Sequence, residues 1–185
     1  ALAVDMLDSC GLVDYELRIG HVGILKDILT GLGLSEEGEP EPPVASAMRL
    51  LDKGDWDGLG ELFSSNSIDQ SNVENLRKLS DLDGGLETID DAKSILDAIG
   101  VSHDSIDELQ TLLQSLELLA PTPPSLKLNL CVARGLDYYT GMVFEVIVPS
   151  MGGEGQVLGG GSYKLLHLFG LPDLDPCCGF GLGFD

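Results

Sequence analysis

Basic side chains are scarce in this sequence. Its 185 residues contain 10 Lys and Arg against 31 Asp and Glu, which gives a formal net charge of -21 at pH 7. A charge of this sign repels phosphates over a Debye length of about 10 Å, so a broad nucleic-acid-binding surface is not expected. Two interpretations of the acidic surface stay open: a solvated surface suited to high salt, or a docking face for a basic partner.

Long apolar runs are also missing. No stretch approaches the roughly 20 apolar residues that a bilayer-spanning helix needs, and the first residues lack the pattern of a secretory signal. We therefore expect a soluble, cytoplasmic protein with no membrane partner. The hydrophobic content of 43% suits one good core, or one domain with a substantial insertion.

Motifs for metals and common cofactors are absent. The four cysteines (Cys10, Cys131, Cys177 and Cys178) form no C-x-x-C pair and have no histidine nearby at metal-ligand spacing. We expect reduced thiols, no metal site and no bound prosthetic group. The sequence also lacks the G-x-x-x-x-G-K-[ST], H-E-x-x-H and G-x-S-x-G motifs, which argues against P-loop, zincin and serine-hydrolase functions.

Hydrophobic periodicity of two predicts strands near both ends of the chain. Apolar residues alternate with polar ones from Tyr15 to Ile19, from Leu126 to Val132 and from Met142 to Val148. After a glycine-rich segment, apolar residues at 163–169 predict a short helix. The sequence therefore predicts an α+β fold with an antiparallel sheet flanked by helices.

Between these strands the spacing becomes helical, over residues 44–119. Linkers rich in proline precede and follow this segment at 35–43 and 120–125. A small helical module inserted between the pieces of the sheet is the simplest architecture. Three capping boxes mark the expected helix starts: Ser71 with Glu74, Thr88 with Asp91, and Ser105 with Glu108.

A glycine-flanked bend between the second and third predicted strands carries a cation, a carboxylate and two phenols. The guanidinium of Arg134 stays charged and is costly to bury without an anion, so we predict that it faces a phosphate or carboxylate. A structural pair with Asp137 or Glu145 is the alternative. Tyr138 and Tyr139 are adjacent and point to opposite faces of a strand, so at most one of them enters a given pocket.

A second candidate site is the glycine run before the predicted short helix. Glycines leave the backbone accessible, which allows close approach of a small ligand to the amide groups. A flexible turn is the alternative interpretation. The residues are Gly159, Gly160, Gly161, Ser162 and Tyr163.

Taken in order, these segments resemble the histidyl-tRNA synthetase family, a class II aminoacyl-tRNA synthetase family. Glu16–Leu25 resembles the segment after the second class motif, Arg134–Thr140 the first histidine signature, and Leu158–Tyr163 the second. Gly179–Asp185 is similar to the opening of class motif 3. The Gly-Gly-Ser-Tyr form of the second signature is similar to the archaeal type.

The resemblance implies a part of a class II synthetase-like catalytic core. Residues 1–39 would be its first part, 40–120 an inserted helical domain, and 121–185 the part with the histidine signatures and the start of motif 3. The first two class motifs and the motif 3 arginine are then outside this sequence. We accordingly expect a fragment, whose parent is a homodimer through regions missing here.

The resemblance also implies an activity and its residues. The family joins histidine to tRNA(His) through histidyl-adenylate, with ATP and Mg2+ as substrate. Alternatives are the histidine-sensing regulatory subunit of ATP phosphoribosyltransferase, which is not an enzyme, and an inactive structural fragment. Arg134 is the implied catalytic residue, Tyr139 is favoured over Tyr138 for reading imidazole, and the other implied substrate contacts are Gly159, Gly160, Gly161, Ser162, Tyr163 and Gly181.

Overall fold

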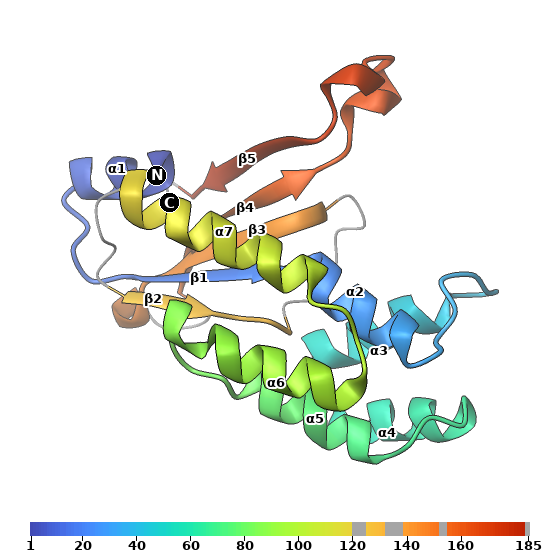
Figure 1. Ribbon diagram of the computed structural model, residues 1–185. Helices are drawn as coiled ribbons and strands as arrows, with labels where there is room; N and C mark the ends of the chain where they lie inside the picture. Colours follow the sequence, from blue (N-terminus) through green and yellow to red (C-terminus); the bar gives the residue numbers. More distant parts are fainter. Residues whose placement is uncertain (120–124, 132–138, 152–154, 184–185) are drawn as a thin grey trace.

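The structure is a computed structural model that describes residues 1–119, 125–131, 139–151 and 155–183 (Figure 1). Within these residues the strands form one sheet of five, in the order β2-β1-β3-β4-β5. All neighbours are antiparallel except β1 and β2, which are parallel. The strands are β1 (Glu16–His21), β2 (Ser125–Leu128), β3 (Tyr139–Ile147), β4 (Gln156–Tyr163) and β5 (Cys177–Leu182).

Helices α1 (Leu2–Ser9) and α7 (Asp104–Leu119) cover one face of the sheet (Figure 1). This face carries the apolar residues of the alternating pattern, among them Leu17, Ile19 and Phe144, which line an apolar groove of about 620 Å³ together with residues of both helices. Burial of such a face is the main favourable term in the folding of the sheet. Helix α2 (Val22–Gly31) follows β1 directly and packs against β3.

The remaining helices lie beyond the β2 edge of the sheet (Figure 1). Apolar side chains from these helices and from the sheet belong to one continuous hydrophobic cluster, which includes Leu17, Phe63 and Leu109. The helical segment therefore shares its core with the sheet. Its other helices are α3 (Pro43–Asp52), α4 (Trp56–Ser65), α5 (Ser71–Ser80) and α6 (Ile89–Ile99).

The predicted capping boxes give the right helix starts but the wrong hydrogen bonds. Helix α5 begins at Ser71, α6 follows Thr88, and α7 begins one residue before Ser105. The hydroxyl of Thr88 donates to the carbonyl of Gly85 at 2.8 Å, and that of Ser105 donates to Asp27 Oδ2 at 2.5 Å. Thr88 thus bonds within the turn that precedes α6, and Ser105 bonds to α2, because other local and tertiary acceptors compete with the cap.

Strand β2 and the short helix near 163–169 differ in their bounds from the prediction. Strand β2 ends at Leu128, not at Val132, because the chain turns at Leu130 and Cys131, where the thiol of Cys131 donates to the carbonyl of Leu76 at 3.6 Å. The predicted helix at 163–169 is confirmed as a short 3-10 helix, η3 (Leu166–Phe169), followed by η4 (Pro172–Leu174). Among the described helices none has the length and apolar character that crossing a membrane requires.

Candidate substrate-binding face

Four glycines of β4 and β5 project to the same side of the sheet and carry no side chains there. Gly159 is the Cα partner of Gly181, and Gly161 is the partner of Gly179. Paired residues of neighbouring strands project to the same side, so all four share one surface, which we call the glycine face. It is opposite the face that α1 and α7 cover. The glycine run thus belongs to strand β4, and the alternative of a flexible turn is wrong.

Two tyrosines close one end of the glycine face. Tyr139 and Tyr163 are Cα partners on β3 and β4, and their ring centroids lie 6.4 Å apart at an interplanar angle of 75°. A Cβ atom at Gly179 would lie 2.9 Å from the hydroxyl oxygen of Tyr163, so the glycine makes room for that ring. Such edge-on pairs are favourable beyond their burial and hold both rings in place.

The glycines of this face differ in what they contact. A Cβ atom at Gly161 would lie 2.5 Å from the carbonyl oxygen of Met142 and 3.0 Å from Tyr139 Cε1, so close packing requires glycine there. A Cβ atom at Gly181 would meet nothing within 4 Å, and the residue is exposed. Packing among the described residues therefore does not explain why position 181 is a glycine. The surface above Gly181 is open for a ligand.

Gly160 and Ser162 project to the opposite side of β4. A Cβ atom at Gly160 would lie 2.5 Å from Phe180 Cβ, and Ser162 is the Cα partner of Cys178. The structure therefore does not bring the Ser162 side chain to the glycine face, although their backbones belong to the same strand. Their assignment as substrate contacts stays a prediction.

Arg134 and Tyr138 lie outside the described residues, so the predicted bend is not part of the geometry above. One proposed partner of Arg134 is described. Glu145 Oε1 lies 3.9 Å from Arg18 Nη1, and its side chain is largely buried.

A charged row continues the sheet surface beyond Gly159, and sequence reasoning missed it. Glu145 is the Cα partner of both Gly159 and Arg18, and Arg18 is the partner of Lys127. Glu16 accepts a hydrogen bond from Arg18 Nε at 2.5 Å and lies 3.3 Å from Lys127 Nζ. The available signal was the alternation itself, since Arg18 between Leu17 and Ile19 must face away from the apolar side. Fixed charges therefore border the glycine face on the β1 side.

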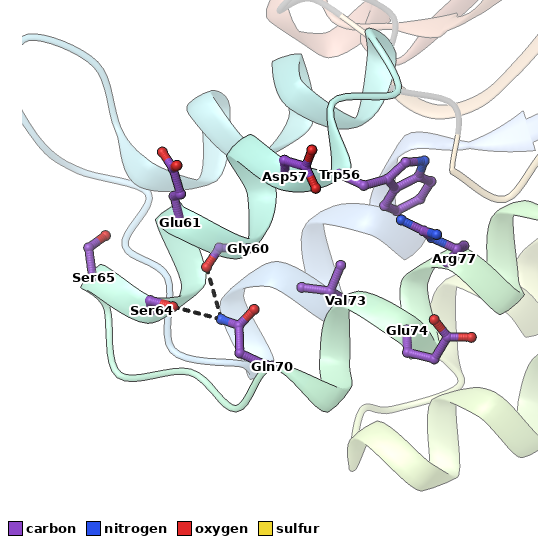
Figure 2. Close-up of a pocket in the computed structure, with 10 residues that line it drawn as sticks. All are labelled: Trp56, Asp57, Gly60, Glu61, Ser64, Ser65, Gln70, Val73, Glu74 and Arg77. Carbon is purple, nitrogen blue, oxygen red and sulfur yellow. Dashed lines mark hydrogen bonds between the residues drawn. The ribbon is translucent and has the colours of Figure 1, made fainter.

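A second hollow, of about 880 Å³, lies between α4 and α5, and its lining includes none of the described residues of the predicted site (Figure 2). The guanidinium of Arg77 lies 5.2 Å from the ring centroid of Trp56, a cation–π distance. Gln70 Nε2 donates to the Gly60 carbonyl and to Ser64 Oγ, both at 2.9 Å. Trp56 also packs against the hydrophobic core.

Comparison with known proteins decides the family. A family model described as Histidyl-tRNA synthetase matches residues 1–185. The chain belongs to the histidyl-tRNA synthetase family. Curated histidine–tRNA ligases agree: that of Archaeoglobus fulgidus is 38% identical over 184 residues, and that of Methanosarcina acetivorans is 37% identical over 185. The chain is covered completely but spans only 41% of each relative's length, which confirms a partial, archaeal-type sequence.

Solved structures of this family confirm the fold. The histidyl-tRNA synthetase of Nostoc sp. PCC 7120 superposes with a TM-score of 0.80 at 20% identity, over 98% of this chain and 43% of that one. A Bacillus halodurans C protein described as an ATP phosphoribosyltransferase regulatory subunit/histidyl-tRNA synthetase gives 0.75 at 25% identity, over 98% and 45%. The predicted α+β architecture, a class II synthetase-like sheet flanked by helices with a small helical insertion, is therefore correct.

Proposed function

We propose that this chain is part of the catalytic core of a longer histidine–tRNA ligase, hereafter the parent protein. In that protein histidine reacts with ATP to give histidyl-adenylate and pyrophosphate, and the histidyl group then passes to the 3' end of tRNA(His). The observation that carries the proposal is the glycine face ending at the Tyr139–Tyr163 pair. Membership of the synthetase family supports it.

Histidine would bind with its ring at the tyrosine end of this face. An apolar slot discriminates similar shapes by only about 1 to 3 kcal/mol, so selection of imidazole needs hydrogen bonds to its two nitrogens. We assign one of them to the Tyr139 hydroxyl, with Tyr163 beside it. The backbone of Gly159 and Gly181 would line the rest of the site, and Gly161 would support the Tyr139 ring, which lies close to it.

The first chemical step forms a bond between a histidine carboxylate oxygen and the α-phosphorus of ATP and breaks the bond to pyrophosphate. Negative charge grows on the α-phosphate oxygens during this attack. We assign the stabilisation of that charge to Arg134, whose guanidinium stays protonated throughout. ATP would enter with Mg2+ as substrate, and we assign no resident metal or prosthetic group to these residues.

The cellular setting follows from the same proposal. A ligase that charges tRNA(His) acts where proteins are made, so we propose the cytoplasm. We also propose that the parent protein is a homodimer, with its interface in regions beyond this sequence. The isolated 185 residues, which span 41% of the relatives, would be inactive.

The test is histidine-dependent exchange of labelled pyrophosphate into ATP by the parent protein. We expect exchange with histidine and none without it or with another amino acid. Absence of exchange under conditions where the protein binds histidine would overturn the proposal.

A second candidate function is that of a regulatory subunit of ATP phosphoribosyltransferase. The 25% identity with the Bacillus halodurans C protein, whose description names both functions, favours it. Such a subunit would bind histidine but would catalyse no pyrophosphate exchange, so the same assay separates the two candidates. The identity of 35 to 38% with archaeal ligases supports the first.

A further inference from the structure

His21 joins three elements of the fold at one buried point. It is the last residue of β1, is 3% exposed, and occupies the N-cap position of α2, where its Nδ1 accepts a hydrogen bond from the Gly23 amide at 3.1 Å. The cap uses only one of the two ring nitrogens.

The second nitrogen determines what else His21 can do. Because Nδ1 accepts a hydrogen bond, the proton of the neutral ring is on Nε2. Nε2 is buried and makes no hydrogen bond to any described residue, yet the carboxylate oxygen Oε2 of Glu108 lies only 3.5 Å away. Glu108 is on α7 and its side chain is 69% exposed, so a small rotation brings it into hydrogen-bond distance.

Helix α7 meets β1 and α2 through two side chains of its first turns. Ser105 donates to Asp27 Oδ2 on α2, and Glu108, three residues later, lies at His21 Nε2. Ser105 and Glu108 are three residues apart and therefore lie on the same face of α7. This spacing matches a capping box in the sequence, but in the structure both side chains contact other elements of the fold. The α7 face is thereby held against the end of β1.

On its other side the ring reaches the strands of the candidate site. His21 is the Cα partner of Met142, and a Cβ atom at Gly141 would lie 3.7 Å from His21 Nε2 and 3.6 Å from Ser162 Oγ. Gly141 is two residues from Tyr139, and Ser162 directly precedes Tyr163. The imidazole therefore lies behind the tyrosine end of the glycine face.

We propose that His21 is a positioning residue: its Nε2–H links Glu108 of α7 to the end of β1, while its ring lies beside Gly141 and Ser162 and thereby fixes the spacing of Tyr139 and Tyr163. Its effect on histidine binding rests on the proposed function; the link between His21 and Glu108 does not. The groups that face the ring are Glu108 from α7 and Asp27 from α2, while β3 and β4 present Met142, Gly141 and Ser162, which do not titrate.

Electrostatics agree with a neutral ring. Burial lowers the pKa of His21, and the nearby carboxylates of Glu108 and Asp27 oppose that shift without reversing it. The neutral ring keeps both of its contacts, one as acceptor and one as donor. Protonation of Nδ1 would break the α2 cap.

The test is a double-mutant cycle in the parent protein, with the histidine dissociation constant measured by calorimetry. His21→Asn keeps an acceptor for the α2 cap and removes the Nε2–H, so it avoids the folding defect expected of His21→Ala. Glu108→Ala removes the acceptor, whereas Glu108→Gln keeps one. Glu117→Ala, on an exposed part of α7, is the matched control.

We expect His21→Asn and Glu108→Ala each to weaken histidine binding roughly three- to tenfold, with the double variant no weaker than either. Glu108→Gln and Glu117→Ala should bind like the wild type, and kcat should change less than KM. Additive effects, or equal losses in Glu108→Gln and Glu108→Ala, would overturn the proposal. If the wild-type protein binds no histidine, the proposed function is refuted but the link between His21 and Glu108 is not. The same double-mutant cycle is then measured by thermal unfolding, and additive changes in the free energy of unfolding would overturn the link.

Discussion

Tyr139 and Tyr163 face each other across β3 and β4 with their ring centroids 6.4 Å apart, and behind them the imidazole of His21 lies near Gly141 and Ser162. Two strands that are distant from β1 in sequence thus meet at one end of the glycine face.

Replacing Tyr139 by Phe keeps the ring pair and removes only the hydroxyl. We expect histidine affinity of the parent protein to fall about tenfold, because a buried imidazole nitrogen loses its partner at a cost of roughly 1 to 3 kcal/mol. Calorimetry measures this directly. Tyr15→Phe is the control: Tyr15 donates to Asp8 at 3.3 Å, away from the glycine face, and its loss should leave affinity unchanged. Equal affinities of Tyr139→Phe and wild type would refute the assignment.

Gly161 and Gly181 form a matched pair on the glycine face. A methyl group at Gly161 would press on Met142 and Tyr139, so Gly161→Ala should lower the free energy of unfolding by about 1 to 3 kcal/mol. A methyl group at Gly181 meets nothing within 4 Å, so Gly181→Ala should fold normally but weaken the binding of histidine or ATP. Thermal unfolding and calorimetry of both variants separate the effects. Unchanged binding by Gly181→Ala would show that the ligand does not use this part of the face.

Arg134→Ala in the parent protein tests the proposed transition-state contact. One charge-assisted contact that forms in the transition state contributes on the order of 3 kcal/mol, so the adenylation rate should fall about 100-fold while histidine affinity stays nearly constant. Arg134→Lys keeps the charge but loses the bidentate hydrogen bonding of the guanidinium, so it should retain part of the adenylation rate. Single-turnover adenylate formation is the measurement. A rate equal to that of wild type would remove Arg134 from the mechanism.

Asp175 stabilises the loop between β4 and β5. Its carboxylate accepts hydrogen bonds from the amides of Leu165, Leu166 and His167 at 3.0 to 3.2 Å. Burial acts to raise the pKa of Asp175, but these amides and the His167 ring outweigh it and hold the pKa below its usual value. The carboxylate therefore contributes stability above about pH 4, and this contribution is lost as the pH falls through the lowered pKa of the folded state.

Asp175→Asn should accordingly speed amide hydrogen exchange at residues 165–167 at pH 7. The difference in free energy of unfolding between Asp175→Asn and the wild type, measured with denaturant, should become smaller below about pH 4, as the wild-type carboxylate takes up a proton. Asp173→Asn is the control, since it makes the same change at an exposed position two residues away. A difference between Asp175→Asn and wild type that stays constant down to pH 3 would show that the carboxylate charge is not the cause.

Much of the fold could be predicted from local pattern. The alternation around Leu17 and Phe144 predicted β1 and β3, and the helical spacing after Thr88 and Ser105 predicted α6 and α7. These signals are local because a residue's side of a strand or helix depends only on its position in the repeat. The boundary of β2 was missed because a turn and a thiol contact to α5 end it, and neither leaves a periodic signal.

The candidate site was predictable in part. Tyr139, Tyr163 and the glycine run could be selected from the sequence as candidates. The contact between the two tyrosines could not be predicted, because they meet only through the pairing of β3 with β4. Ser162 belonged to the same motif as Tyr163, yet its side chain projects to the other face of the sheet. Arg134 and Tyr138 lie outside the described residues, so their roles stay predictions.

By itself the sequence determined the family and the succession of β1, the helical segment, β2 and β3, since these depend on residue types and short-range periodicity. Only the tertiary structure decided that Gly159, Gly161, Gly179 and Gly181 share one surface, that Ser105 and Glu108 bond across to α2 and β1, and that Nε2 of His21 is buried beside Glu108. Register between strands and contacts between helices are set by packing of the whole core, and no local repeat encodes them.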